Sequence, residues 1–210
     1  MRAIISRVTR IADAFTWPFR ARLGRWAGGV IAVLLLPVAF IPLLGYAIAA
    51  TRAAAEEPSQ GPPPWPSVWR LLADGFWTAL VVGLTLSPFT IAFIALAQVV
   101  SGIALVVAFF LLALPWGLTA LLLLPHATAS FATTGNPRAL FDVRASLRGV
   151  RRDFAIWNIV VAAIVSGWAI GLACAGLLCV GIVPGIFYAI LVSAHATAAL
   201  ARPRPDPSAR

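Results

Sequence analysis

The sequence predicts an all-α protein, a polytopic bundle of membrane helices, and three observations carry this prediction. Of the 210 residues, 61% are hydrophobic and 11% are charged, whereas soluble domains have about a quarter charged residues. Several apolar runs reach the roughly 20 residues that a helix needs to cross the hydrocarbon core. The charges lie between these runs and not in their middle. We expect one membrane domain over residues 1–201, followed by a disordered, proline-rich tail over 202–210.

Residues 1–25 contain the first predicted element, an amphipathic helix at the membrane surface. Ile4, Val8, Ile11 and Phe15 recur at spacings of four, three and four, which places them on one helix face. Arginines occupy the rest of the helix wheel, a pattern typical of a helix in the lipid interface. An amphipathic helix packed on protein has the same pattern. We favour the interface because the sequence offers no soluble domain to receive the helix.

The apolar segment over residues 26–50 raises the main question of topology. Pro37 and Pro42 lie where a membrane helix has its middle. The segment is long enough for one kinked span or for a shallow re-entrant hairpin, since two full crossings need about 40 residues. A hairpin bent at the two prolines would return Tyr46 to the side on which the segment begins. Length alone leaves both topologies open.

The distribution of arginine favours the hairpin. All sixteen cationic residues are arginine. If the segment crosses, six N-terminal arginines oppose ten in the later loops and tail; if it re-enters, all sixteen lie on one side. The positive-inside rule prefers the second arrangement and makes that side the cytoplasm. We therefore expect a protein of the cytoplasmic membrane with both termini in the cytoplasm.

The rest of the chain reads as a linker, two hairpins and a basic helix between them. Prolines in residues 53–66 exclude a helix and favour an extended linker. Residues 75–131 and 155–201 form hairpins with tight turns, which supply four full spans. Residues 138–153 form a basic amphipathic helix that suits anionic headgroups of the inner leaflet. Its four arginines on the polar side are Arg144, Arg148, Arg151 and Arg152.

Three apolar segments end alike, which indicates a threefold internal repeat. An aromatic residue or a histidine is followed by Ala-x-Ala and a small residue at Tyr46, His126 and His195. Each copy would consist of a surface helix and a membrane hairpin, and internal repeats are common in membrane folds. Chance similarity among alanine-rich helix ends is the alternative explanation.

Few polar side chains are candidates for a site. Tyr46, His126, Asn158 and His195 would line a pocket or an interface; for the histidines, hydrogen bonds to backbone or headgroups are the alternative. Neither histidine has a carboxylate or cysteine partner in the sequence pattern, so we predict no catalytic residue, no metal and no cofactor.

Small residues in the last hairpin predict close helix packing. Gly167 and Gly171 form a GxxxG motif on one helix face, which permits close contact within the fold or between protomers. We expect the contact within the fold. Cys174 and Cys179 lie in an apolar run and are expected to be buried free cysteines.

Short motifs in a fixed order resemble a known family. They are Pro18-Phe19-Arg20, the proline-broken run that ends at Gly45-Tyr46, "PPW" at 63–65, "DGF" at 74–76 and "GNPRALFD" at 135–142. Over roughly residues 15–200, the chain resembles the bacterial and archaeal membrane family called domain of unknown function four thousand and thirteen. The resemblance implies an integral membrane protein, and it supplies neither an activity nor catalytic residues.

Taken together, these features favour a non-enzymatic role. We expect a scaffold or accessory protein that holds basic helices against the inner leaflet and binds anionic lipid, a protein partner or a second copy of itself. A transporter or channel for an uncharged or lipidic solute is the alternative, with a path near His126 and His195. An enzyme ranks third, because acid–base groups are missing from the spans. The basic charge does not indicate nucleic acid, since the arginines flank apolar segments.

Overall fold

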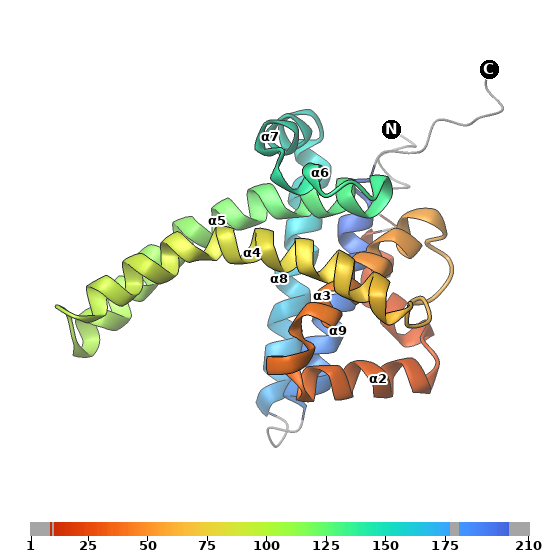
Figure 1. Cartoon of the computed structure of the whole chain (residues 1–210), viewed down its shortest axis with the longest axis horizontal. Helices are drawn as coiled ribbons and strands as arrows, with labels where there is room; N and C mark the ends of the chain where they lie inside the picture. Colours follow the sequence, from red (N-terminus) through yellow and green to blue (C-terminus); the bar gives the residue numbers. More distant parts are fainter. Residues whose placement is uncertain (1–8, 10, 177–180, 202–210) are drawn as a thin grey trace.

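The computed structural model describes residues 9, 11–176 and 181–201, and this part of the chain is helical without any strand. It confirms the predicted all-α class (Figure 1). Three short 3₁₀ turns, η1 (Asp13–Phe15), η2 (Trp17–Arg20) and η3 (Cys174–Gly176), accompany the α-helices. These helices are α2 (Leu23–Leu34), α3 (Leu36–Glu56), α4 (Val68–Ala97), α5 (Gly102–Thr134), α6 (Arg138–Phe141), α7 (Val143–Arg152), α8 (Phe154–Ala173) and α9 (Ile182–Ala198). The predicted tail over 202–210 lies outside the described residues.

Four of the described helices, α3, α4, α5 and α8, are long and apolar enough to cross a membrane. The apolar helices α2 and α9 are shorter, with 12 and 17 residues. At 1.5 Å per residue, α9 is about 26 Å long, slightly less than the roughly 30 Å hydrocarbon core. This set of helices is consistent with an integral membrane protein.

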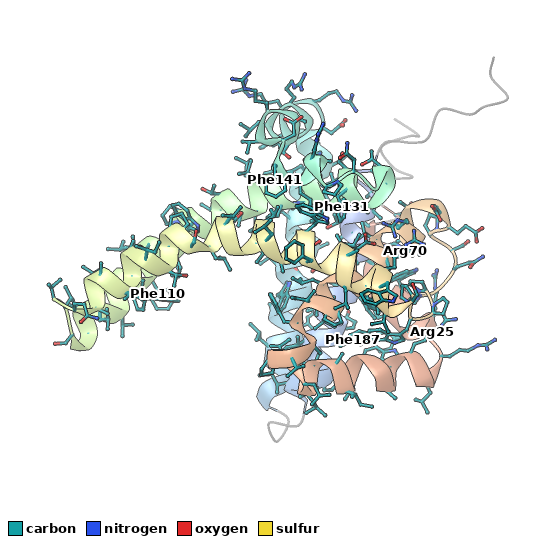
Figure 2. The ribbon with its side chains drawn as sticks, in the orientation of Figure 1. Arg25, Arg70, Phe110, Phe131, Phe141 and Phe187 are labelled. Carbon is teal, nitrogen blue, oxygen red and sulfur yellow. The ribbon has the colours of Figure 1, made fainter. Side chains whose placement is uncertain are left out.

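The helices α2, α3, α8 and α9 form the centre of the structure, and α4 and α5 extend from it as a long arm (Figure 1). In this view, the arm runs across α8 and α9. Its surface carries large apolar side chains along most of its length (Figure 2). The 30 residues of α4 make a helix of about 45 Å, and a helix longer than the hydrocarbon core fits a bilayer by tilting.

Glycines allow two pairs of helices to cross at close range. A methyl group at Gly45 of α3 would overlap the backbone of α4, and one at Gly75 of α4 would overlap the backbone of α3. Gly171 of α8 and Gly185 of α9 face each other in the same way. A methyl group at Gly167 would lie 2.8 Å from a Val192 side-chain atom on α9. Both glycines of the predicted GxxxG motif therefore pack within the fold.

The N-terminal element is α-helical at residues 9, 11 and 12, as predicted, and differs from the predicted surface helix beyond them. Residues 1–8 and 10 lie outside the description, and 3₁₀ turns follow from Asp13 to Arg20. Pro18 explains the end of the helical pattern, since its ring removes a backbone N–H. Ile11 and Ala14 are buried against α8 and α9. The apolar face in this region therefore contacts protein, which was the alternative to a lipid interface for the same sequence pattern.

The first apolar segment is broken at a different place from the one predicted. The helices α2 and α3 meet at Leu35, before Pro37, whereas the sequence placed the bend at the two prolines. Pro37 occupies the first turn of α3, where no backbone N–H is required. Pro42 lies inside α3 without ending it. The bend is therefore the junction of two helices, and Tyr46 lies on the second one.

The predicted linker also begins later than expected, because α3 continues to Glu56. Alanine and glutamate are strong helix formers, and they fill residues 53–56. The helix ends only before Pro58, whose ring disfavours helical geometry at Glu57. At the other end of the linker, α4 starts at Val68, several residues before the predicted hairpin at 75.

The predicted basic helix over 138–153 is two helices, α6 and α7, separated at Asp142. The Asp142 carboxylate accepts a hydrogen bond of 2.8 Å from the Ala145 backbone N–H. This is an N-cap, a role for which aspartate is among the best residues. The sequence periodicity did not reveal this interruption.

Candidate functional site

A proline-rich strap (residues 57–66) is fastened to the structure by side chains from the preceding elements. Prolines have no N–H to donate, so the strap's backbone carbonyls need donors from elsewhere. Four side chains supply them, from η2, α2 and α3. The bonds run from the Trp17 indole to Gln60 O, from Arg20 to Ser59 O (3.2 Å), from Arg25 to Pro62 O and from the Tyr46 hydroxyl to Pro63 O (3.0 Å).

These bonds show that the first apolar segment doubles back. Trp17 and Arg20 precede α2, and their bonding partners Ser59 and Gln60 follow α3. The start and the end of the segment therefore lie together in space. The sequence predicted an extended linker over residues 53–66 and did not reveal this docking.

An aromatic cluster fills the space behind the strap. Tyr46 stacks on Trp65 with 4.2 Å between ring centroids and lies 5.9 Å from Phe187 of α9. His195 is buried, 5.0 Å from the Trp17 ring. Tyr46 and His195, two of the residues predicted to line a pocket or an interface, thus belong to packed protein.

The three segments with similar ends come together in the structure. The ends of α3 and α9 pack through small residues such as Ala50 and Ala194. Arg52 of α3 connects this helix with α5 and with α4. Its Nε donates a hydrogen bond of 2.8 Å to Ala132 O of α5, and its guanidinium group lies 3.2 Å from an Asp74 carboxylate oxygen of α4. Asp74 therefore serves a helix crossing.

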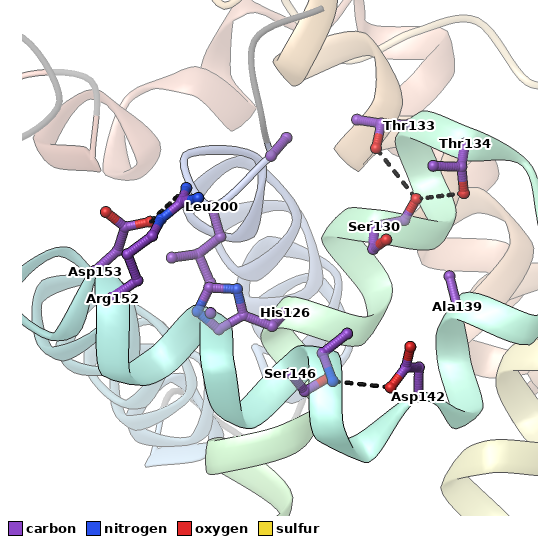
Figure 3. A pocket seen from close by; sticks show the side chains of 13 residues that line it. His126, Ser130, Thr133, Thr134, Ala139, Asp142, Ser146, Arg152, Asp153 and Leu200 are labelled. Atoms are coloured by element: carbon purple, nitrogen blue, oxygen red, sulfur yellow. Dashed lines mark hydrogen bonds and ion pairs between the residues drawn. The ribbon is translucent and has the colours of Figure 1, made fainter.

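A polar cleft of about 250 Å³ lies between α5, α7 and the chain that follows α9. Figure 3 shows its side chains, among them His126, Ser130 and Arg152. His126 approaches α7 closely, since a methyl group at Gly149 would lie 2.8 Å from its Nδ1. His195 does not line this cleft. The two histidines thus occupy different surroundings despite their equivalent positions in the proposed repeat.

The acidic groups of the cleft already serve structural roles. Asp142 caps α7, and Asp153 forms a 3.2 Å ion pair with Arg152. Asn158, another predicted pocket residue, lies exposed on α8 outside the cleft. No group of three or more metal-binding side chains occurs within the described residues. The cleft therefore offers polar surface without a recognisable catalytic arrangement.

The outer face of α7 is strongly basic. Arg144, Arg148, Arg151 and Arg152 are all exposed on a helix of 10 residues. The opposite face is docked, since Ser146 and Val150 are buried. This orientation follows the amphipathic pattern of the sequence, and it presents the guanidinium groups outward beside the ends of the apolar helices α5 and α8.

Comparison with known proteins identifies a family for this chain. No curated protein and no solved structure matches it. A family model matches residues 29–187, most of the chain, including α3, the strap and the basic helix α7. The chain therefore belongs to the family described as protein of unknown function (DUF4013), as the order of its motifs had indicated.

Proposed function

We propose that this protein is a non-enzymatic membrane scaffold that binds anionic lipid through α7 at the cytoplasmic surface. The observation that carries the proposal is the orientation of α7. Its apolar side is docked on the helix ends, and four arginines face outward. A fixed basic helix beside membrane-spanning segments suits the anionic headgroups of the inner leaflet.

Simple electrostatics gives the scale of the effect. A basic side chain near an anionic membrane surface contributes about 1 kcal/mol. The charge of Arg152 is partly neutralised by its ion pair with Asp153. The other three arginines form no ion pair with any described residue: Arg144, Arg148 and Arg151. The helix therefore supplies about 3 kcal/mol of attraction at low salt, enough to enrich anionic lipid beside it.

The doubled-back first segment supports the topology that this function needs. The strap holds the start of α2 and the end of α3 together. If this segment is re-entrant, the residues that precede α2 and the residues that follow α3 lie in the same compartment. All sixteen arginines then share that compartment, which the positive-inside rule assigns to the cytoplasm. The later half of the segment is mostly buried against protein from Leu43 to Ala54, whereas Leu34, Leu35 and Val38 at the bend are exposed.

The packed centre supports a scaffold over a transporter. A path near His195 would have to pass the place where Trp17, Tyr46, Phe187 and Leu191 are fully buried against one another. The polar cleft at His126 lies instead near the ends of α5 and α9.

Spin-labelled lipids test the proposal in reconstituted protein. We expect labelled phosphatidylglycerol to be enriched over labelled phosphatidylcholine in the motionally restricted lipid around the protein. The Arg148→Gln/Arg151→Gln variant should lose a large part of this preference. A matched control, Arg22→Gln/Arg70→Gln, removes two exposed arginines outside α7 and should change this preference less. Equal preference in all three proteins would overturn the proposal.

A further inference from the structure

Two adjoining recesses lie beside α6 and α7, and only one of them has charged side chains in its lining. An apolar groove of about 180 Å³ runs between α4, α5 and the α6–α7 break, and includes Leu84, Leu124 and Val143 in its lining. An open hollow of about 530 Å³ adjoins it and contains Arg138 and Arg144. Phe141 and Val143 line both recesses, so the groove and the hollow are neighbours. Figure 2 shows Phe141 at this position, beside α5.

We propose that one anionic phospholipid binds here, with an acyl chain in the apolar groove and its phosphate on Arg138 and Arg144. This inference rests on the proposed function and deepens it. The face of α7 would enrich anionic lipid in general, whereas this site would hold a single molecule in a fixed place.

The break at Asp142 creates the cationic end of the site. In one continuous helix, residues 138 and 144 would be about 120° apart around the axis and would face different directions. Because α6 and α7 are separate helices, both arginines line the same hollow. Arginine suits a phosphate, since its planar group of N–H donors matches the oxygens in pairs.

The charges in the hollow favour an anion. Neither Arg138 nor Arg144 forms an ion pair with the residues that the structure describes. Asp142 also lines the hollow, and its carboxylate already accepts the hydrogen bond from Ala145 that caps α7. Two arginines against one aspartate leave a net charge of +1 for the phosphate.

The groove favours an acyl chain. Leu84, Phe141 and Val143 are large apolar side chains that remain exposed, and a lipid chain along them would cover this surface. The polar residues in its lining are Thr85 and Ser146. Ser146 is buried, and the Thr85 carbonyl accepts the Trp116 indole N–H. The walls therefore offer mainly hydrocarbon contacts.

Native mass spectrometry of the purified full chain in detergent tests this site. The probes are phosphatidylglycerol, phosphatidylcholine with the same acyl chains, and glycerol 3-phosphate as a headgroup without chains. We expect one phosphatidylglycerol to bind with clear preference over phosphatidylcholine. The Arg138→Gln/Arg144→Gln variant should weaken its binding by about 25-fold, at roughly fivefold per arginine. Val143→Trp should weaken both phospholipids by filling the groove, and glycerol 3-phosphate should not compete.

The control separates this inference from the general proposal. Arg148→Gln/Arg151→Gln removes two arginines of α7 outside the hollow and should leave the single bound lipid in place. Loss of that lipid to the same extent in both double variants would overturn the site and still support lipid binding by α7. No preference for phosphatidylglycerol in the unmodified protein would overturn both. Competition by glycerol 3-phosphate would overturn the role of the groove. Size-exclusion and circular dichroism profiles like those of the unmodified protein would establish that each variant is folded.

Discussion

The ion pair between Arg52 and Asp74 joins three helices, and we predict that Arg52→Gln strongly destabilises the protein. The arginine lies on α3, the carboxylate on α4, and a second bond reaches Ala132 O on α5. The substitution removes the charge and shortens the side chain. It leaves the Asp74 carboxylate without its cation and the α5 carbonyl without this donor.

The magnitude follows from burial. The Arg52 and Asp74 side chains are 17% and 16% exposed. Removing one partner of a buried ion pair costs about 3–5 kcal/mol, and the remaining solvent access places our value near the lower end, about 3 kcal/mol. A second pair, Arg152 with Asp153, has the same separation of 3.2 Å, but its side chains are 64% and 30% exposed. An exposed pair contributes about 0–1 kcal/mol.

The assay is reversible unfolding in mixed micelles with increasing fractions of denaturing detergent, followed by circular dichroism. Arg52→Gln should lower the free energy of unfolding by about 3 kcal/mol, and Arg152→Gln by less than about 1 kcal/mol. Asp74→Asn combined with Arg52→Gln should cost less than the sum of the two single variants, because they remove one shared interaction. Equal small losses in Arg52→Gln and Arg152→Gln would refute the role assigned to this pair.

Three further predictions address packing, the strap and lipid binding. Gly171→Ala should destabilise by about 1–3 kcal/mol because its methyl group would overlap the Gly185 backbone; Gly83→Ala, which faces open space, should not destabilise in the same unfolding assay. Tyr46→Phe removes the hydroxyl that binds Pro63 O and should cost about 1–3 kcal/mol; unchanged proteolysis of the strap would contradict its role as a fastener. Raising the salt concentration from 0.1 to 1 M shortens the Debye length from about 10 to 3 Å, so the lipid preference at α7 should fall in the spin-label assay, and a salt-independent preference would argue against electrostatic binding.

Most of the helical architecture could be predicted because it follows from local patterns. Long apolar runs predicted α4, α5 and α8, and the spacing of Leu140, Val150 and the arginines predicted a basic amphipathic helix. The predicted helix boundaries were less accurate where a single residue determines the position at which a helix begins or ends. Asp142 caps a new helix inside a continuous periodicity, and residues 53–56 continue α3 because no proline lies between Pro42 and Pro58.

The contacts between distant segments could not be predicted from these patterns. Arg52 and Asp74 are separated by 22 residues and meet only because α3 and α4 cross at glycines. The strap was predicted as a linker, because the sequence does not show which distant side chains donate hydrogen bonds to its backbone carbonyls. The hollow with Arg138 and Arg144 depends on the angle between two short helices, which periodicity does not specify.

The central claim is that the strap and the basic helix α7 lie on the same, cytoplasmic side of the membrane. Cysteine labelling in intact cells tests it most directly, in a background where Cys174 and Cys179 are replaced. Ser59→Cys places a thiol on an exposed part of the strap, Arg151→Cys on α7, and Ser101→Cys at the turn between α4 and α5. We predict that an impermeant maleimide labels Ser101→Cys alone, and that the other two thiols react only after permeabilisation. Labelling of Ser59→Cys from outside, with Arg151→Cys still protected, would contradict the doubled-back first segment in the membrane and the shared compartment that the proposed function requires.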